Sequence, residues 1–298
     1  MKYDLKRYID EIKLLPITDM LSDSALESLS RIYMAVYNLV TTCALENEYG
    51  DGGLYRERIN HLLTICRKRC ASDQSLFRRS SLLPVLHHIC YGTFCASPAN
   101  EEAYCSQYAD EVIADWLSEY ESTGNRTWEY DILRNIANLF YYVPEACKDD
   151  REYVYFKQRV SEWVVTLCAD SSWNGLSVHE ALERLDVICR NSYMFLDATN
   201  DKHIESTFDY YFNRAIAEMS ELPNVAVDDC RTLALLYEVS MFSMDHDNMK
   251  EISFLAETWL RRLAIGSEER LLCLSVYIDN LCMKMAQEIE NQAFINIA

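Results

Sequence analysis

The densest group of reactive side chains in the sequence lies between residues 87 and 95. It holds two adjacent histidines and two cysteines: His87, His88, Cys90 and Cys95. Neutral imidazole and thiolate groups bind Zn²⁺ when they converge on one ion. No CxxC pair and no HExxH sequence accompanies them. Because cysteines are common on the apolar helical positions of this chain, core packing is the favoured interpretation and a zinc site is the alternative.

Four aspartates form a second group that can do chemistry: Asp228, Asp229, Asp245 and Asp247. Further carboxylates at comparable positions are Glu129, Asp131 and Glu180. Two carboxyl groups that face each other across a pocket can act as general acid and base, as in glycoside hydrolysis. Most of these residues also lie near expected helix starts, where acidic side chains cap free N–H groups and complement the helix dipole. Capping is therefore the favoured interpretation, and acid–base catalysis is the alternative.

The segments that must position these residues are apolar and recur at a spacing of roughly fifty residues. They begin near residues 25, 80, 128, 177, 228 and 268. In the first of them, Leu26, Leu29, Tyr33 and Val36 recur every three or four positions, which places one apolar stripe along a helix. The repeat predicts an all-α fold of about six helical hairpins.

The segments between them differ in kind, because each has one apolar stripe and one charged face. They cover residues 54–70, 101–122, 150–168, 202–221 and 249–264. A helix that is apolar nearly all round is buried, whereas a one-sided helix lies at the surface. The alternation predicts an inner and an outer layer of helices, as in an α/α toroid or, as a second choice, an open α-solenoid.

Local signals mark several helix ends. Ser24 with Glu27, and Ser177 with Glu180, have the spacing of a capping box. The glycine cluster at residues 50–53 predicts a turn between two helices, because the Lys-Ser/Thr of a phosphate-binding loop does not follow it.

Composition favours one continuous domain over residues 1–298. Half of the residues (50%) are hydrophobic, and only 7 Gly and 5 Pro occur, so no segment has the composition of a linker. The length is sufficient for a large core. The 12 cysteines are spread over apolar helical positions, and reduced thiols packed as small hydrophobic groups are expected.

The charge of the chain bears on its partners and location. A formal net charge of −19 argues against nucleic acid, because phosphate contacts need clustered Lys and Arg. No run of about 18 apolar residues predicts a transmembrane helix. The charged start of the chain lacks the apolar core of a signal peptide. These features predict a cytoplasmic protein that binds neither nucleic acid nor membrane.

Two short stretches resemble lanthionine-synthetase-C-like proteins: Ile89-Cys90-Tyr91-Gly92 and Trp173-Asn174-Gly175-Leu176-Ser177. Those proteins are α/α toroids in which glycine-containing turns open the inner helices, and their cyclases hold zinc with a Cys and a later Cys-His pair. The resemblance implies a toroid with Cys90 at the first ligand position. No Cys-His-Gly sequence occurs in this chain, so the implied toroid lacks the cyclase chemistry. At the same coarse level the chain is similar to six-hairpin glycosidases, without a recognisable catalytic pair.

The repeat, together with the lack of an intact catalytic motif, predicts a soluble, non-catalytic binding or scaffold protein. Its partner is expected to be a peptide or protein held on a concave or axial helical surface, because stacked repeats generate such surfaces. No cofactor is expected under this interpretation. The alternative is an α/α-toroid enzyme, dependent on zinc or on carboxylates, that acts on a modified peptide or a glycan.

Overall fold

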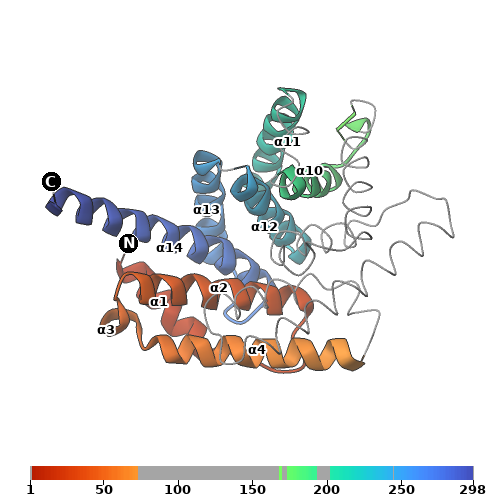
Figure 1. Cartoon of the computed structure of the whole chain (residues 1–298). Helices are drawn as coiled ribbons and strands as arrows, with labels where there is room; N and C mark the ends of the chain where they lie inside the picture. Colours follow the sequence, from red (N-terminus) through yellow and green to blue (C-terminus); the bar gives the residue numbers. More distant parts are fainter. Residues whose placement is uncertain (1, 73–167, 170–172, 193–201, 244, 298) are drawn as a thin grey trace, which may run out of the picture. The chain divides into compact units, whose positions relative to one another are not determined.

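The computed structural model describes residues 2–72, 168–169, 173–192, 202–243 and 245–297. Within these ranges the chain forms nine helices and no strand, which confirms the predicted all-α class (Figure 1). The helices are α1 (Lys2–Leu14), α2 (Asp23–Thr42), α3 (Glu46–Tyr49), α4 (Gly52–Ser72), α10 (Val178–Ser192), α11 (Lys202–Ser220), α12 (Val227–Phe242), α13 (His246–Leu260) and α14 (Glu268–Ile297).

Each predicted segment that falls within the described residues corresponds to one helix. Residues 25–43 match α2, 54–70 match α4, 202–221 match α11 and 249–264 match α13, while α10, α12 and α14 begin at the expected apolar segments. The predicted segments that begin near residues 80 and 128, and those over 101–122 and 150–168, lie outside the described residues except for position 168. The periodicity did not identify α1 or the single turn of α3.

Two compact units divide the chain. The first contains Met1–Cys66, Leu222–Tyr237 and Asp245–Ala298, and the second contains Arg67–Glu221 and Glu238–Met244. Helix α12 contributes residues to both. The prediction of a single domain over residues 1–298 is not tested by this division and stays a prediction.

Helix α14 is the centre of the first unit, where it packs along α2 and also against α13 (Figure 1). Close to the starts of α2 and α14, the Ser24 hydroxyl donates a hydrogen bond to Glu268. Nearer the middle of α14, the rings of Tyr8 and Tyr277 meet edge to face with centroids 5.2 Å apart, which fastens α1 to the same helix.

Helices α12 and α14 run in the same direction. Four side-chain contacts between described residues join them, at sequence separations of 37, 43, 42 and 46 residues: Arg231 with Glu268, Cys230 with Cys273, and Tyr237 with both Asp279 and Met283. Because the sequence separation stays similar from one contact to the next, the two helices run in parallel. An antiparallel pair would show a separation that shrinks steadily from one contact to the next.

Helix α13 lies between α12 and α14 in the sequence, and it runs in the opposite direction to α14. The Arg270 guanidinium, near the start of α14, donates to the carbonyl oxygen of Leu260 at the end of α13. Further along α14, the Asn280 side-chain amide donates to the carbonyl oxygen of Met249, near the start of α13, at 2.7 Å. α13 and α14 therefore form an antiparallel hairpin.

The two kinds of predicted segment differ in burial as well as in composition. Every residue of α14 from 270 to 278 is buried, so this stretch is enclosed on all sides. On α13, Ile252 and Trp259 are buried while Phe254 between them is 70% exposed. The first part of α14 is therefore buried all round, whereas α13 has an exposed face; the inner and outer layers of helices stay a prediction.

The end of α1 is fixed by side chains from two other helices. Arg58 of α4 donates to the carbonyl oxygens of Lys13 at 2.9 Å and Leu15 at 3.2 Å. Tyr33 of α2 donates to the carbonyl oxygen of Ile12 at 3.1 Å. The last carbonyls of a helix have no i+4 N–H partner within it, and these side chains supply donors there, although Ile12 O also accepts from Leu15 N at 3.1 Å.

In the second unit, the turn before α10 matches the glycine-containing turn expected there. Gly175 has a φ of +78°, which favours glycine. The capping box predicted for Ser177 and Glu180 is confirmed, because Ser177 N donates to Glu180 Oε2 at 2.9 Å and Glu180 N donates to Ser177 Oγ at 3.3 Å. Tyr211 of α11 donates to the carbonyl oxygen of Trp173 at 3.2 Å.

The other predicted capping box is wrong. α2 begins at Asp23, and its N-cap is Ser22, whose hydroxyl accepts a hydrogen bond from Ala25 N. Ser24 bonds to Glu268 instead, and Glu27 forms an ion pair with Arg31. The helix starts earlier than predicted because a second serine, two positions upstream, takes the capping role.

Candidate functional site

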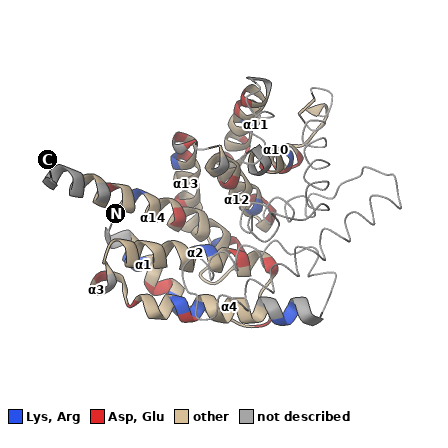
Figure 2. Ribbon diagram, viewed as in Figure 1, with Lys and Arg blue, Asp and Glu red and all other residues tan. Residues whose placement is uncertain are grey.

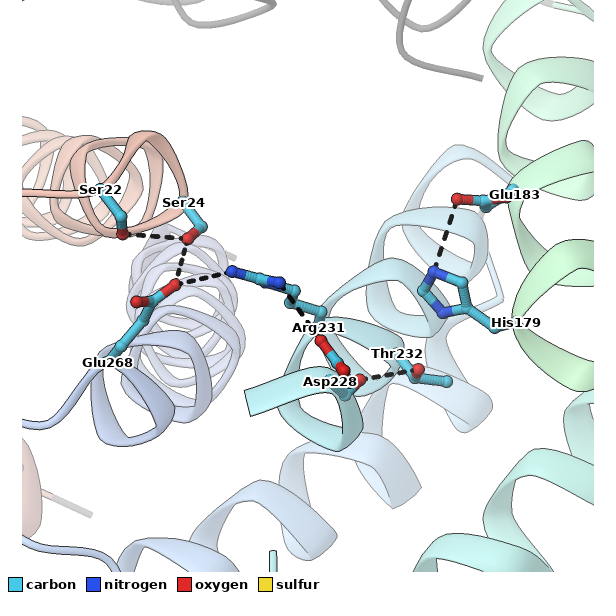
Figure 3. Close-up of polar contacts among 8 residues, drawn as sticks. All are labelled: Ser22, Ser24, His179, Glu183, Asp228, Arg231, Thr232 and Glu268. Atoms are coloured by element: carbon cyan, nitrogen blue, oxygen red, sulfur yellow. Dashed lines mark hydrogen bonds and ion pairs between the residues drawn. The ribbon is translucent and has the colours of Figure 1, made fainter. Parts of the chain in front are cut away.

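A polar network joins the starts of α2, α12 and α14 in the first unit (Figure 3). The Ser22 and Ser24 hydroxyls are 3.1 Å apart, and Ser24 donates to Glu268 Oε1. From the other side, Arg231 Nη2 donates to the same oxygen at 3.1 Å, and its Nη1 pairs with Asp228 Oδ1 at 3.2 Å. We call these five residues the Glu268 network.

The Glu268 carboxylate is held in its charged form. Its burial favours the neutral acid, but hydrogen bonds from Ser24 and Arg231 outweigh this effect and hold its pKa below the ordinary 4.5. The positive ends of the helix dipoles at the starts of α2 and α14 favour the same negative charge. A carboxylate with a lowered pKa is a poor proton donor near neutral pH, so the network serves better to hold three helix starts together than to catalyse proton transfer.

The charge of Glu268 is expected to make stability depend on pH. Because its pKa is lowered by folding, its stabilising effect is complete above pH 4.5 and is lost as the pH falls through and below that value. Glu268→Gln is therefore expected to cost about 1 kcal/mol at neutral pH and progressively less in acid. Urea denaturation of both proteins at several pH values measures this. A difference that stays constant from neutral pH into acid would contradict the role assigned to the charge.

A second polar contact lies deeper between α12 and α14. The Tyr237 hydroxyl donates to Asp279 Oδ2 at 2.9 Å and lies 3.9 Å from the sulfur of Met283. Tyr237 is only 2% exposed. Burial raises the pKa of Asp279, although the hydrogen bond from Tyr237 and the positive charge of Arg31 oppose it. Burial, and then the nearby Asp279 charge, raise the pKa of Tyr237 as well.

Removal of the Asp279 charge is expected to stabilise the protein. Because folding raises the pKa of this carboxyl group above 3.8, the ionised form costs stability at neutral pH, and the cost disappears as the pH falls and the group is protonated. Asp279→Asn keeps the shape and can still accept the Tyr237 hydrogen bond. It is expected to raise the melting temperature at neutral pH, with an advantage that narrows in acid. A lower melting temperature at every pH would contradict this.

The two aspartates predicted at the start of α12 make local contacts. Asp229 Oδ2 accepts a hydrogen bond from Ala226 N at 2.8 Å, which caps the helix. Asp228 is exposed and pairs with Arg231 one turn later, so it belongs to the Glu268 network. The Asp229 contact agrees with the capping interpretation, whereas Asp228 forms a surface ion pair. The sequence did not predict that Arg231 would link Asp228 to Glu268 on α14.

The two aspartates predicted at the start of α13 also make only local contacts among those described. Asp245 is the N-cap, and its side chain accepts from Asn248 N at 3.0 Å. Asp247 pairs with Lys250 at 2.8 Å and is exposed. The contacts of all four aspartates described above thus fit helix capping and surface pairing, and the catalytic alternative stays an untested prediction. Glu129 and Asp131 lie outside the described residues.

The predicted zinc ligands His87, His88, Cys90 and Cys95 also lie outside the described residues, as does the Ile89–Gly92 stretch of the family resemblance. Across the part of the chain that the structure does describe, no three His, Cys, Asp or Glu side chains are grouped in a way that could hold a metal ion. In the same part, every helix is too short or too polar to cross a bilayer.

Asp279 has a signal in the sequence that does not take the form of a motif. Between residues 271 and 283, Asp279 is the single charged residue in an otherwise uncharged helical stretch. A lone carboxylate in such a stretch indicates a buried acid with a dedicated partner. No such signal exists for Glu268, because a glutamate near a helix start is ordinary.

Comparisons with known proteins add no family to this description. No family model, no curated protein and no solved structure matches the chain.

Proposed function

We propose that the chain is a helical-repeat binding protein whose hairpins close into an α/α toroid and which holds a basic peptide or protein segment at one end of the ring. The observation that carries the proposal is the packing of α2, from the first hairpin, along α14, the last helix. In an open solenoid each repeat contacts only its neighbours, so the first and last inner helices lie far apart. In a closed ring they are adjacent.

The directions of the helices support the same arrangement. α2, α12 and α14 begin together at the Glu268 network and run in parallel, while α13 returns antiparallel to α14. Inner helices of a toroid share one direction because each is followed by an outer helix that returns. An up-and-down bundle places antiparallel neighbours side by side instead.

Small-angle X-ray scattering of the full chain tests the closure. A compact single body of 298 residues is expected to have a radius of gyration of about 19 Å. An open row of six hairpins is elongated and would give a distinctly larger value and an asymmetric distance distribution. That second result, in a sample shown to be monomeric, would overturn the ring.

The binding surface is proposed at the end where these helices start. Met20, in the connector that leads into α2, is 91% exposed, and Ile265, in the connector that leads into α14, is 76% exposed. The Ser24–Glu268 hydrogen bond ties the two helix starts together. Acidic residues occupy the first turns of all three helices, including Asp23, Asp229 and Glu269 (Figure 2). Apolar anchors beside negative charge fit a partner segment that is basic and carries apolar side chains.

Selection from a displayed random-peptide library against the purified chain tests the partner chemistry. Enriched peptides are expected to be rich in Lys and Arg, and their binding is expected to weaken as salt is added. Met20→Asp and Ile265→Asp are expected to weaken the selected peptides about tenfold or more. Phe254→Asp is the matched control, because Phe254 is also exposed but lies on α13 away from the helix starts.

Two outcomes would overturn the binding proposal. One is a set of selected peptides that bind Met20→Asp and Ile265→Asp as tightly as they bind the unchanged protein. The other is turnover of a modified peptide or a glycan by the purified chain, which would favour the toroid-enzyme alternative.

A further inference from the structure

Two cysteines face each other inside the first unit. Cys230 of α12 and Cys273 of α14 have their sulfur atoms 3.5 Å apart, and both residues are 0% exposed. They lie 43 positions apart in the sequence, with the whole of α13 between them. Neither residue belongs to the Glu268 network or to the proposed binding surface.

We propose that Cys230 and Cys273 are a disulfide-forming pair, which is reduced in the resting protein and closes into a covalent clamp between α12 and α14 when the protein meets a small-molecule disulfide. The proposal does not depend on the proposed function. It assigns a modification site to residues that the sequence alone presents as two buried, apolar thiols.

The geometry is already close to that of the product. A disulfide has a sulfur–sulfur distance of about 2.05 Å, so the two atoms must approach by about 1.5 Å. The helices that carry them are parallel neighbours held by Arg231–Glu268 near their starts and by Tyr237–Asp279 further along both helices. Because both contacts fix the spacing of the helices, side-chain rotation supplies most of the remaining approach.

The reaction balances with a disulfide oxidant such as oxidised glutathione. One cysteine thiolate attacks the glutathione disulfide, which forms a mixed disulfide and releases one glutathione thiolate. The second cysteine then attacks the protein sulfur of that mixed disulfide, which forms the Cys230–Cys273 bond and releases the second glutathione thiolate. The two cysteines give up two protons and two electrons in total, and the glutathione disulfide is reduced to two thiols.

The burial of the two thiols limits the rate at which they are oxidised. The hydrogen bond between the two thiols, and then burial, raise the pKa of Cys273, so little of its thiolate form exists in the closed structure. The oxidant also has no access to either sulfur while both are fully buried. The first step therefore occurs during local opening of α12 or α14, and the second follows when the helices close again. The pair is expected to oxidise slowly but to hold its disulfide firmly once formed.

Peptide mapping of the unmodified full chain tests the proposal. The reduced protein is incubated with oxidised glutathione, both at room temperature and just below its melting temperature, where local opening is frequent. It is quenched with acid, alkylated and digested without reduction. A cross-linked peptide pair that contains Cys230 and Cys273 is expected. The melting temperature of the oxidised protein is expected to rise by about 5 °C or more, because the bond closes a long loop.

Two variants provide the controls for the melting experiment. Cys230→Ala is expected to abolish the increase, whereas Cys282→Ala, at another buried cysteine of α14, is expected to retain it. Recovery of both cysteines as alkylated thiols after both incubations would overturn the proposal. Stable glutathione adducts on each, or cross-links to other cysteines in place of this pair, would also overturn it. The mapping uses the unchanged chain, so the result stands even if a variant fails to fold.

Discussion

Glu11→Ala is expected to lower the free energy of unfolding by about 3–5 kcal/mol, because it leaves a buried guanidinium without its partner. Arg270 donates two hydrogen bonds to the Glu11 carboxylate, at 2.5 and 2.7 Å, from α14 to α1. The side chains are only 5% and 11% exposed. Arg270 also donates to the carbonyl oxygens of Leu260, the last residue of α13, and of Leu263 in the connector that follows, so the pair connects three helices. Urea denaturation of the variant and the unchanged protein measures the loss.

The double variant Glu11→Met/Arg270→Met separates the cost of an unpaired charge from the value of the pair. Replacing both partners removes the buried charges together, so the double variant is expected to be more stable than Glu11→Ala. The exposed ion pair of Arg261 with Glu257 on α13 is the control, and Glu257→Ala is expected to change the unfolding curve little. A loss for Glu11→Ala no greater than that for Glu257→Ala would contradict the buried role of the pair.

Leu274→Ala is expected to cost about 2–5 kcal/mol, because it opens a cavity in the stretch of α14 that is enclosed on all sides. Leu274 is 0% exposed, as are Cys273 before it and Ile278 one turn later. Phe254→Ala removes a larger side chain from α13, but that side chain is 70% exposed, so its effect is expected to stay within about 0.5 kcal/mol. Thermal and chemical unfolding of both variants would show the contrast. Similar losses at the two positions would mean that α13 and α14 do not differ in burial as described.

The sequence predicted the class of the fold and most of its helices because their periodicity is local. Apolar positions three and four residues apart define α2, α10 and α13 without reference to any other part of the chain. The same signal was present for α1, where Leu5, Tyr8, Ile9 and Ile12 lie on one face and are buried. The charges in this segment argue against a signal peptide, but its apolar spacing is that of a helix, so α1 was predictable from the sequence.

The contacts that define the candidate sites could not be predicted, because they join positions far apart in the sequence. Ser24 and Glu268 are 244 positions apart, and Glu11 and Arg270 are 259 positions apart. Both serine and glutamate have acceptable local roles at a helix start, and those roles were the ones predicted for Ser24 and Glu27. Only the packing of α2 along α14 decides that Ser24 binds Glu268. The sequence around Ser24 therefore does not reveal its partner, because that partner is set by the folded chain.

The packing of α2 along α14 also has a consequence for synthesis on the ribosome. Helix α2 (Asp23–Thr42) leaves the ribosome well before α14 (Glu268–Ile297), which packs along it. At a synthesis rate of about 5–20 residues per second, the apolar side chains of α2 stay uncovered by α14 for a time on the order of tens of seconds. During that interval Leu26, Leu29 and Val36, all 0% exposed in the finished protein, are open to other nascent chains. Chaperones that shield apolar segments are therefore expected to bind the growing chain through α2 and to leave it only after α14 has been made.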